Sequence, residues 1–243
     1  MNASAPAERA ARRDIRHQDL LALSRLVGTG YCALGTALED GATVARGAFD
    51  LTQVRPGLLL HASDARYQRT MTTRLVKERS LNLSYVLEGE WQASLGGVPL
   101  SCDGSRPRAM FFVLSESDLW ERHAAQGGHA RMVNVMVSPE WLDGNGLDGS
   151  DLNAGAVAHL SRLHGKHWQW RPSARAIALA GQILGRPIYT GALQRLYLES
   201  RTLDLVLESL AQLTDSSPAP GRAAGRLADE RRMRIVRERL NEA

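Results

Sequence analysis

Cysteine, lysine and long apolar runs are scarce in this chain of 243 residues. No stretch approaches the roughly 18 apolar residues of a membrane-spanning helix, and the first 18 residues lack the apolar core of a secretory signal. Cys32 and Cys102 form no CxxC pair, so we expect two reduced thiols and not a disulfide framework. We therefore predict a cytoplasmic protein without a membrane partner.

Lysine occurs only at Lys77 and Lys166, so arginine supplies almost all of the 30 basic residues. The formal net charge is +4, and residues 222–243 carry most of it, with seven arginines against four acidic residues. The rest of the chain is close to neutral. A neutral body lacks the concentrated basic face that nucleic-acid binding requires.

Motifs of common catalytic sites are missing. There is no GxSxG, no Gly-rich loop followed by Lys-Ser or Lys-Thr, and neither cysteine has a histidine in a recognisable motif. His159, His164 and His167 are close in sequence, but their spacing is not the i, i+4 pair of a helical zinc site, and no HxH occurs. We predict no catalytic residue, no metal site, no cofactor and no enzymatic activity.

The sequence pattern of residues 31–140 is typical of a β-rich domain. Apolar and polar residues alternate through 81–87 and 91–95, and the short link at 88–90 predicts that these two runs form a hairpin. Four further segments have the character of strands: 58–61, 71–77, 110–114 and 132–137. Many short strands separated by turn residues predict a cupin-like β-barrel, or jelly roll.

Helical periodicity replaces this alternation after residue 140. Ser173 is placed to cap a helix that ends at Gly185-Arg186-Pro187, and an amphipathic helix follows over 190–213. The predicted fold class is thus α+β, a barrel followed by an α-helical hairpin. We divide the chain into an N-terminal arm, a barrel, a helical dimerisation region, a linker and one last helix, at 1–30, 31–140, 141–214, 215–226 and 227–243.

Three segments resemble the AraC/XylS family of transcription regulators, and in particular its pyochelin-regulator-like, siderophore-responsive branch. They are LNLSYVLEGEWQASLGG at 81–97, GALQRLYLESRTLDLVLESLAQL at 191–213 and LADERRMRIVRERLNEA at 227–243. The resemblance implies a barrel that binds a small-molecule effector, a lid formed by residues 1–20, and a helix that pairs two subunits. The implied effector is a ferric siderophore of the pyochelin or yersiniabactin kind.

The resemblance also implies promoter DNA as a partner, bound through a C-terminal domain of about a hundred residues with two helix-turn-helix units. Only seventeen residues, 227–243, follow the predicted linker. We therefore expect a chain that is truncated before this domain and does not bind promoter DNA specifically.

Six side chains are candidate ligand contacts in the barrel. Tyr85 and Trp91 offer aromatic surface, although aromatic residues on strands also serve as ordinary core residues. Trp120 is placed either at the barrel mouth or under a loop. Arginines that could bind an anionic group through paired hydrogen bonds, or else be solvated at strand ends, are Arg55, Arg66 and Arg131.

The helix at 190–213 carries a stripe that is mostly leucine, and it has two interpretations. It could pack against the barrel of its own chain. Alternatively, it could pack against the same helix of a second subunit in a homodimer, because Leu196, Leu203 and Leu210 recur every seven residues. The predicted interface consists of Leu196, Ser200, Leu203, Leu207 and Leu210. Leu205, Val206 and Leu213 lie off this stripe, which favours one face inward and one towards a partner.

The sequence therefore predicts the effector-sensing and dimerisation region of an AraC-type transcription regulator. Two alternatives remain open at this point. One is a stand-alone cupin-type metalloenzyme, and the other is a truncated antagonist that acts by forming heterodimers.

Overall fold

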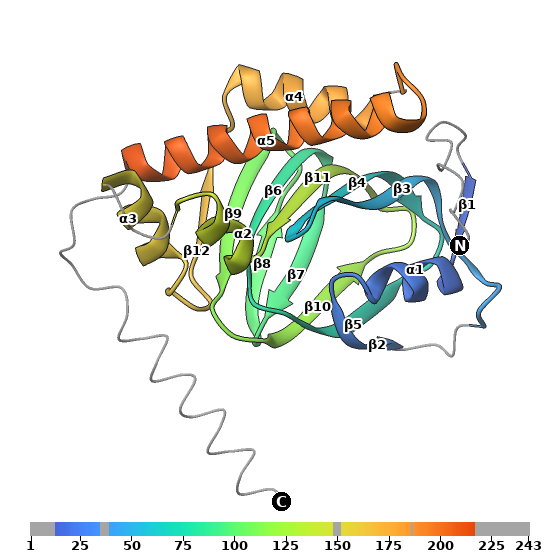
Figure 1. The fold of residues 1–243 in the computed structure, drawn as a ribbon. Helices are drawn as coiled ribbons and strands as arrows, with labels where there is room; N and C mark the ends of the chain where they lie inside the picture. The colour runs from blue at the N-terminus through green and yellow to red at the C-terminus, as the bar shows by residue number, and fades with distance from the viewer. Residues whose placement is uncertain (1–12, 35–38, 148–151, 186, 217–243) are drawn as a thin grey trace, which may run out of the picture.

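The computed structural model describes residues 13–34, 39–147, 152–185 and 187–216. Two antiparallel sheets face each other, and two helices lie across the outer face of the larger sheet (Figure 1). The seven-stranded sheet has the order β1 (Arg13–Arg16), β3 (Thr43–Arg55), β4 (Leu58–Tyr67), β11 (His129–Val137), β6 (Ser80–Gly89), β9 (Arg108–Leu114) and β12 (His167–Trp170). The five-stranded sheet has the order β2 (Gly28–Leu34), β5 (Met71–Lys77), β10 (Asp118–Ala124), β7 (Trp91–Leu95) and β8 (Val98–Cys102).

This arrangement confirms the predicted α+β, cupin-like fold. Within the described residues the two sheets remain separate and are not closed into one continuous barrel. All six strand segments that the sequence predicts are present as β4, β5, β6, β7, β9 and β11.

The predicted hairpin at 81–95 is wrong. β6 pairs with β9 and β11 in the larger sheet, whereas β7 pairs with β8 and β10 in the smaller one. Gly89, at φ +80°, turns the chain from one sheet to the other. The hairpin in this region is β7–β8, whose turn contains Gly96 and Gly97 at φ +54° and +81°.

β6 is buried on both faces, not on one. Its residues Leu81, Leu83, Tyr85 and Leu87 pack beneath the helices, while Asn82 and Ser84 point between the two sheets. The sequence alternation predicts a strand with a polar face in water. The structure instead covers that face with the second sheet.

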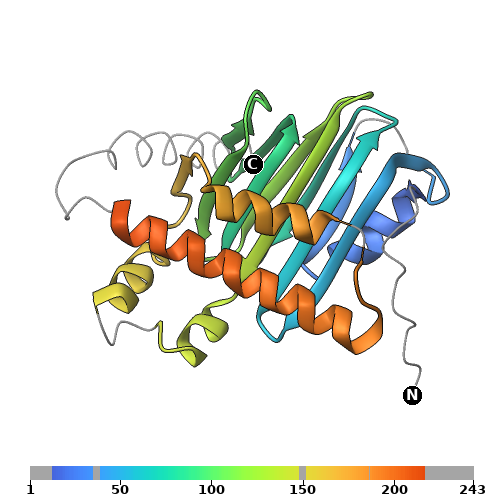
Figure 2. The ribbon, with the colours of Figure 1, turned by 90° about the horizontal axis from the view of Figure 1, so that it is seen from above.

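The helical hairpin is α4 (Ala174–Leu184) and α5 (Gly191–Ser216), which run side by side across the larger sheet (Figure 2). Ser173 caps α4 as predicted, because its Oγ accepts a hydrogen bond from the Ala176 amide at 3.0 Å. α5 buries Leu198, Leu205, Val206 and Leu213, the last three being the residues that lie off the predicted stripe. Figure 2 also shows that α5 spans most of the width of the sheet.

Three shorter helices complete the described chain: α1 (His17–Ser24), α2 (Pro139–Gly144) and α3 (Leu152–Leu160). β1 and α1 fall in the predicted arm, and β12 falls in the predicted helical region. The first twelve residues, most of the predicted linker and the last predicted helix lie outside the described residues. None of the helices that the structure describes has both the length and the apolarity needed to cross a membrane.

Candidate functional site

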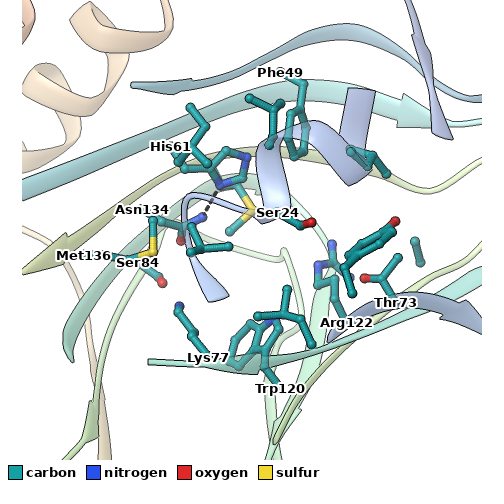
Figure 3. A pocket seen from close by; sticks show the side chains of 18 of the residues that line it. Ser24, Phe49, His61, Thr73, Lys77, Ser84, Trp120, Arg122, Asn134 and Met136 are labelled. Carbon is teal, nitrogen blue, oxygen red and sulfur yellow. Dashed lines mark hydrogen bonds between the residues drawn. The ribbon is translucent and has the colours of Figure 1, made fainter. Parts of the chain in front are cut away.

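A cavity of about 180 Å³ lies between the two sheets. Alternate residues of the strands point into it, because successive side chains of a strand face opposite sides of a sheet. Its walls are mostly apolar, formed in part by Phe49, Met71, Leu75, Trp91, Phe112, Trp120, Met132 and Met136. Several polar side chains interrupt these walls, among them His61, Thr73, Lys77, Ser84, Arg122 and Asn134 (Figure 3). A largely apolar pocket with a few polar groups is typical of a small-molecule site.

Lys77 is the most unusual of these residues. It is only 8% exposed, and its Nζ donates a hydrogen bond to Asn82 Oδ1 at 2.5 Å. The ammonium group also lies 4.8 Å from the ring centroid of Trp120 and 5.1 Å from that of Phe112. Burial disfavours the charged form and lowers the pKa of Lys77 from 10.5 to about 7.

Arg122 is the second cationic residue in the cavity wall. Its guanidinium donates hydrogen bonds to the carbonyl oxygens of Gln92 and His123, and it lies over the rings of Tyr67 and Trp91. Arg122 also borders an adjoining pocket of about 360 Å³. It therefore stands between the two spaces.

The remaining polar groups are neutral side chains and one histidine. Asn134 Nδ2 donates to His61 Nδ1 at 2.7 Å (Figure 3). Asn134 Oδ1 and the Tyr31 hydroxyl are buried and have no hydrogen-bond partner among the described residues. Burial, together with the neighbouring Cys32, raises the pKa of Tyr31 to about 12. Unsatisfied buried polar atoms of this kind are suited to bind a ligand or water.

α1 covers one side of the cavity. Leu20, Leu23 and Ser24 of this helix, followed by Val27, contribute to the lining. β1 fixes the start of α1, because it pairs with β3 from Arg13 to Arg16. The part of the predicted arm that the structure describes is therefore built into the wall.

Two of the six predicted ligand contacts, Trp91 and Trp120, line the cavity. Their ring centroids are 5.8 Å apart, and Trp120 stacks on Phe112 with a centroid distance of 5.2 Å. These three rings form an aromatic wall next to Lys77. Trp120 thus lies inside the sandwich and not at its mouth.

The other four predicted contacts point away from the cavity. Tyr85 faces α5, where its hydroxyl lies 2.5 Å from Ser209 Oγ, and burial raises the pKa of Tyr85 to about 12. The three arginines lie on the outer face of the larger sheet: Arg55 pairs with Glu199, Arg131 with Glu88, and Arg66 donates to the Gly127 carbonyl. None of these four residues is among those that line either pocket.

Sequence reasoning missed Lys77 and Arg122. Lys77 follows Met71, Thr73 and Leu75 at the inward positions of the strand predicted over 71–77. A lysine at an inward position, in a chain with only two lysines, was the available signal. The signal at Arg122 was weaker. Arg122 is two residues after Trp120 and so shares its face of the strand, but the surrounding segment has no apolar pattern.

The predicted interface on α5 is split between two environments. Leu196 and Leu207 are 60% and 61% exposed, and Ser200 is exposed too, whereas Leu203 and Leu210 are partly buried against the core. Leu193, Ile188 and Tyr189 extend the exposed apolar surface towards the start of α5, with exposures of 61%, 68% and 45%.

In the part of the chain that the structure describes, no three histidine, cysteine, aspartate or glutamate residues come together in a way that could hold a metal ion. His164 is instead paired with Asp118 Oδ2 at 3.0 Å.

Comparisons with known proteins give one family match. The model of the regulatory protein PchR N-terminal domain matches residues 46–227. No curated protein matches the chain significantly.

The solved structures that match this chain are distant from it in sequence. The AraC-like transcriptional activator CuxR is 11% identical, with 88% of this chain and 73% of CuxR covered and a TM-score of 0.47. ToxT from Vibrio cholerae is 9% identical, with coverages of 68% and 60% and a TM-score of 0.39. The EutQ protein of Clostridium difficile is 14% identical, with coverages of 43% and 77% and a TM-score of 0.30.

Proposed function

Because this chain belongs to the family of regulatory protein PchR N-terminal domains, we propose that it senses a small-molecule effector for an AraC-type transcription regulator. The cavity between the sheets is the observation that carries this proposal. It lies between the two sheets, it has apolar and aromatic walls, and it contains buried polar atoms that lack a protein partner among the described residues. Such a regulator acts in the cytoplasm, and another domain would bind promoter DNA.

The finer proposal concerns the effector. The branch that the sequence segments resemble responds to iron-loaded siderophores, so a ferric siderophore is the first candidate. Room for a ligand of that size is supported by the adjoining pocket, which shares Tyr67, Met71, Arg122 and Ala124 with the inner cavity. Displacement of the Arg122 side chain would join the two spaces.

β6 offers a route from the cavity to α5. Ser84 lines the cavity, and its neighbour Tyr85 contacts Ser209 Oγ and the Leu205 carbonyl of α5 on the opposite face. A ligand that shifts β6 therefore changes the packing of α5. Such a response needs an effector that binds the two arrangements with different affinity.

A thermal-shift screen against metabolites and iron chelates tests the sensing proposal. The screen compares the wild type with Ser84→Phe, in which an aromatic ring would fill part of the cavity. We expect at least one compound to raise the Tm of the wild type and not that of Ser84→Phe. A screen in which every compound shifts both proteins equally would contradict the proposal.

We also propose that the chain forms a homodimer through the exposed apolar face of α5. This face consists of Leu193, Leu196 and Leu207, with Ile188 and Tyr189 beside it. Large exposed apolar side chains gathered on one helix commonly mark a protein interface. The partly buried Leu203 and Leu210 would contribute less than Leu196 and Leu207.

The dimer is tested with Leu207→Arg, which places a charge in the proposed interface. We expect light scattering to give the mass of a dimer for the wild type and of a monomer for Leu207→Arg. Val98→Arg is the matched control, because Val98 is 41% exposed and lies on β8, away from the helical layer. An equal mass for Leu207→Arg and wild type would remove this face from the interface.

Binding accounts for these features better than catalysis does. The alternative of a cupin-type metalloenzyme needs a group of metal ligands, and the described residues contain none. The buried polar groups of the cavity are instead mostly amides, hydroxyls and two basic side chains. These groups are suited to orient a ligand.

A further inference from the structure

We propose that Lys77 selects an aromatic carboxylate as the ligand of the inner cavity, by binding the carboxylate group through its ammonium. The inference rests on the proposed function, since it concerns the same cavity, and it adds the chemical group, an aromatic carboxylate, that the effector would place in the inner cavity. The geometry around Lys77 carries the argument.

Lys77 is buried, and its contacts with the described residues leave binding capacity unused. An ammonium group has three N–H donors, and one of them is directed to Asn82 Oδ1. The side chain is 8% exposed, so bulk water has little access to the other two donors. Figure 3 shows Nζ pointing into the cavity, on the same side as Ser84 and Asn134.

No carboxylate is among the described residues that line the cavity. Asp118 is opposite Lys77 on β10, but its Oδ2 pairs with His164 Nε2 at 3.0 Å. Glu121 is on the other face of β10, where it pairs with Arg74. A buried cation that lacks an anionic partner is costly to the fold, and an anionic ligand would supply that partner.

The aromatic wall defines the rest of the ligand. Trp120 lies within 4.8 Å of Lys77 Nζ, measured to the ring centroid, and stacks on Phe112. A flat ligand that carries its carboxylate directly on a ring can place the carboxylate at Lys77 and the ring against Trp120. The proposed ligand is therefore aromatic as well as anionic.

Arg122 is a poorer anchor for this carboxylate. In the β5–β10 register it lies four residues along the strand from the position opposite Lys77, about 13 Å away. Its donors already bind the carbonyl oxygens of Gln92 and His123 and approach the Tyr67 hydroxyl at 3.5 Å. Arg122 would instead control access from the adjoining pocket.

The pKa of Lys77, lowered to about 7 by burial, gives the proposal a pH signature. Above pH 7 the free protein holds Lys77 mostly neutral, so an anion that binds there brings a proton with it. Affinity should be constant below pH 7 and should fall up to tenfold for each pH unit above it. Other titratable or charged groups near the cavity are His61, Tyr31, Arg122 and the Asp118–His164 pair, so a Lys77 variant is the necessary control.

The experiment uses isothermal titration calorimetry with 1-naphthoate and its neutral isostere 1-naphthamide, on the wild type, Lys77→Met and Lys166→Met. Lys166 is the matched control, because it is the only other lysine and does not line the cavity. At pH 6.5 we expect wild type and Lys166→Met to bind naphthoate at least tenfold more tightly than naphthamide. In Lys77→Met this preference should vanish, while naphthamide binding is kept.

Proton uptake is measured on the wild type alone, at pH 8 in two buffers of different ionisation enthalpy. We expect most of one proton to be taken up with naphthoate and none with naphthamide. Naphthamide that binds as tightly as naphthoate would overturn the role of Lys77 and leave the sensing proposal standing. Failure of both ligands to bind would also overturn the inference, whereas the sensing proposal is decided by the metabolite screen.

Discussion

Lys77 lowers the stability of the folded protein by an amount that depends on pH. Its pKa falls from 10.5 in the unfolded chain to about 7 in the folded one. Between these values the unfolded chain binds the extra proton, so stability rises as the pH increases from 7 to 10.5 and is lowest below 7. A residue that lowers stability and lies in a binding cavity is typical of a functional position.

Replacement of Lys77 by methionine should therefore stabilise the protein at neutral pH. Removal of the buried charge should raise the free energy of unfolding by a few kcal/mol. Loss of the hydrogen bond that Asn82 Oδ1 accepts should lower it by about 1–3 kcal/mol, which offsets part of this gain. We expect a higher Tm for Lys77→Met than for wild type at pH 6.5, and a smaller difference near pH 10. Thermal unfolding followed by circular dichroism at both pH values measures this, and a difference that does not change with pH would refute the explanation.

Tyr85 illustrates the limit of prediction from residue type. Only three residues separate the predicted strands that carry Tyr85 and Trp91, yet these strands belong to different sheets. Trp91 points into the cavity between the sheets, whereas Tyr85 points away from it. Alternation shows which residues share a face but not which face meets the ligand. Lys77 and Arg122 were missed for a related reason, because charged residues on strands usually face water.

Substitution of Tyr85 by phenylalanine separates the roles of ring and hydroxyl. The ring stays buried, and Ser209 keeps its own hydrogen bond to the Leu205 carbonyl. We expect a loss of about 1 kcal/mol in the free energy of unfolding, measured with urea, and unchanged affinity for cavity ligands. A large loss of ligand affinity would instead place Tyr85 in the binding site.

At the scale of elements, the length of α5 was predictable and its orientation was not. The sequence predicts a helix over 190–213, and the structure has one at Gly191–Ser216. Leucines occur around most of this helix, so periodicity alone does not decide which face meets the sheet. The buried face includes Thr202 and Ser209, whose hydroxyls bond to carbonyl oxygens one turn earlier. Because these two residues are polar, the buried face does not stand out as an apolar pattern in the sequence.

The junction between α4 and α5 depends on Ser173. Its Oγ accepts from the Ala176 amide and donates to Glu208 Oε2 of α5 at 2.8 Å. We expect Ser173→Ala to lower the free energy of unfolding by about 1 kcal/mol, because α4 loses its cap. Ser161→Ala is a useful control in the same urea experiment, since within the described part of the chain the Ser161 hydroxyl bonds only to the nearby Ala158 carbonyl. Equal stability of Ser173→Ala and wild type would show that the cap contributes nothing.

At the scale of the whole molecule, the β-rich body and the helical hairpin were predictable from the change of periodicity near residue 140. The assignment of strands to two sheets was not, because pairing depends on contacts between distant segments. β1 and β12 were missed since a strand of four residues is too short to show alternation. These two strands occupy the two edges of the larger sheet.

The cavity is the proposed effector site, and α5 is the element proposed to respond to the effector. Hydrogen–deuterium exchange of the wild-type protein, with and without the strongest stabiliser from the metabolite screen, tests both points at once. We expect slower exchange in α1, β5 and β10, which line the cavity, together with a change in α5. Slower exchange confined to other surfaces, with α1, β5, β10 and α5 unchanged, would contradict the account.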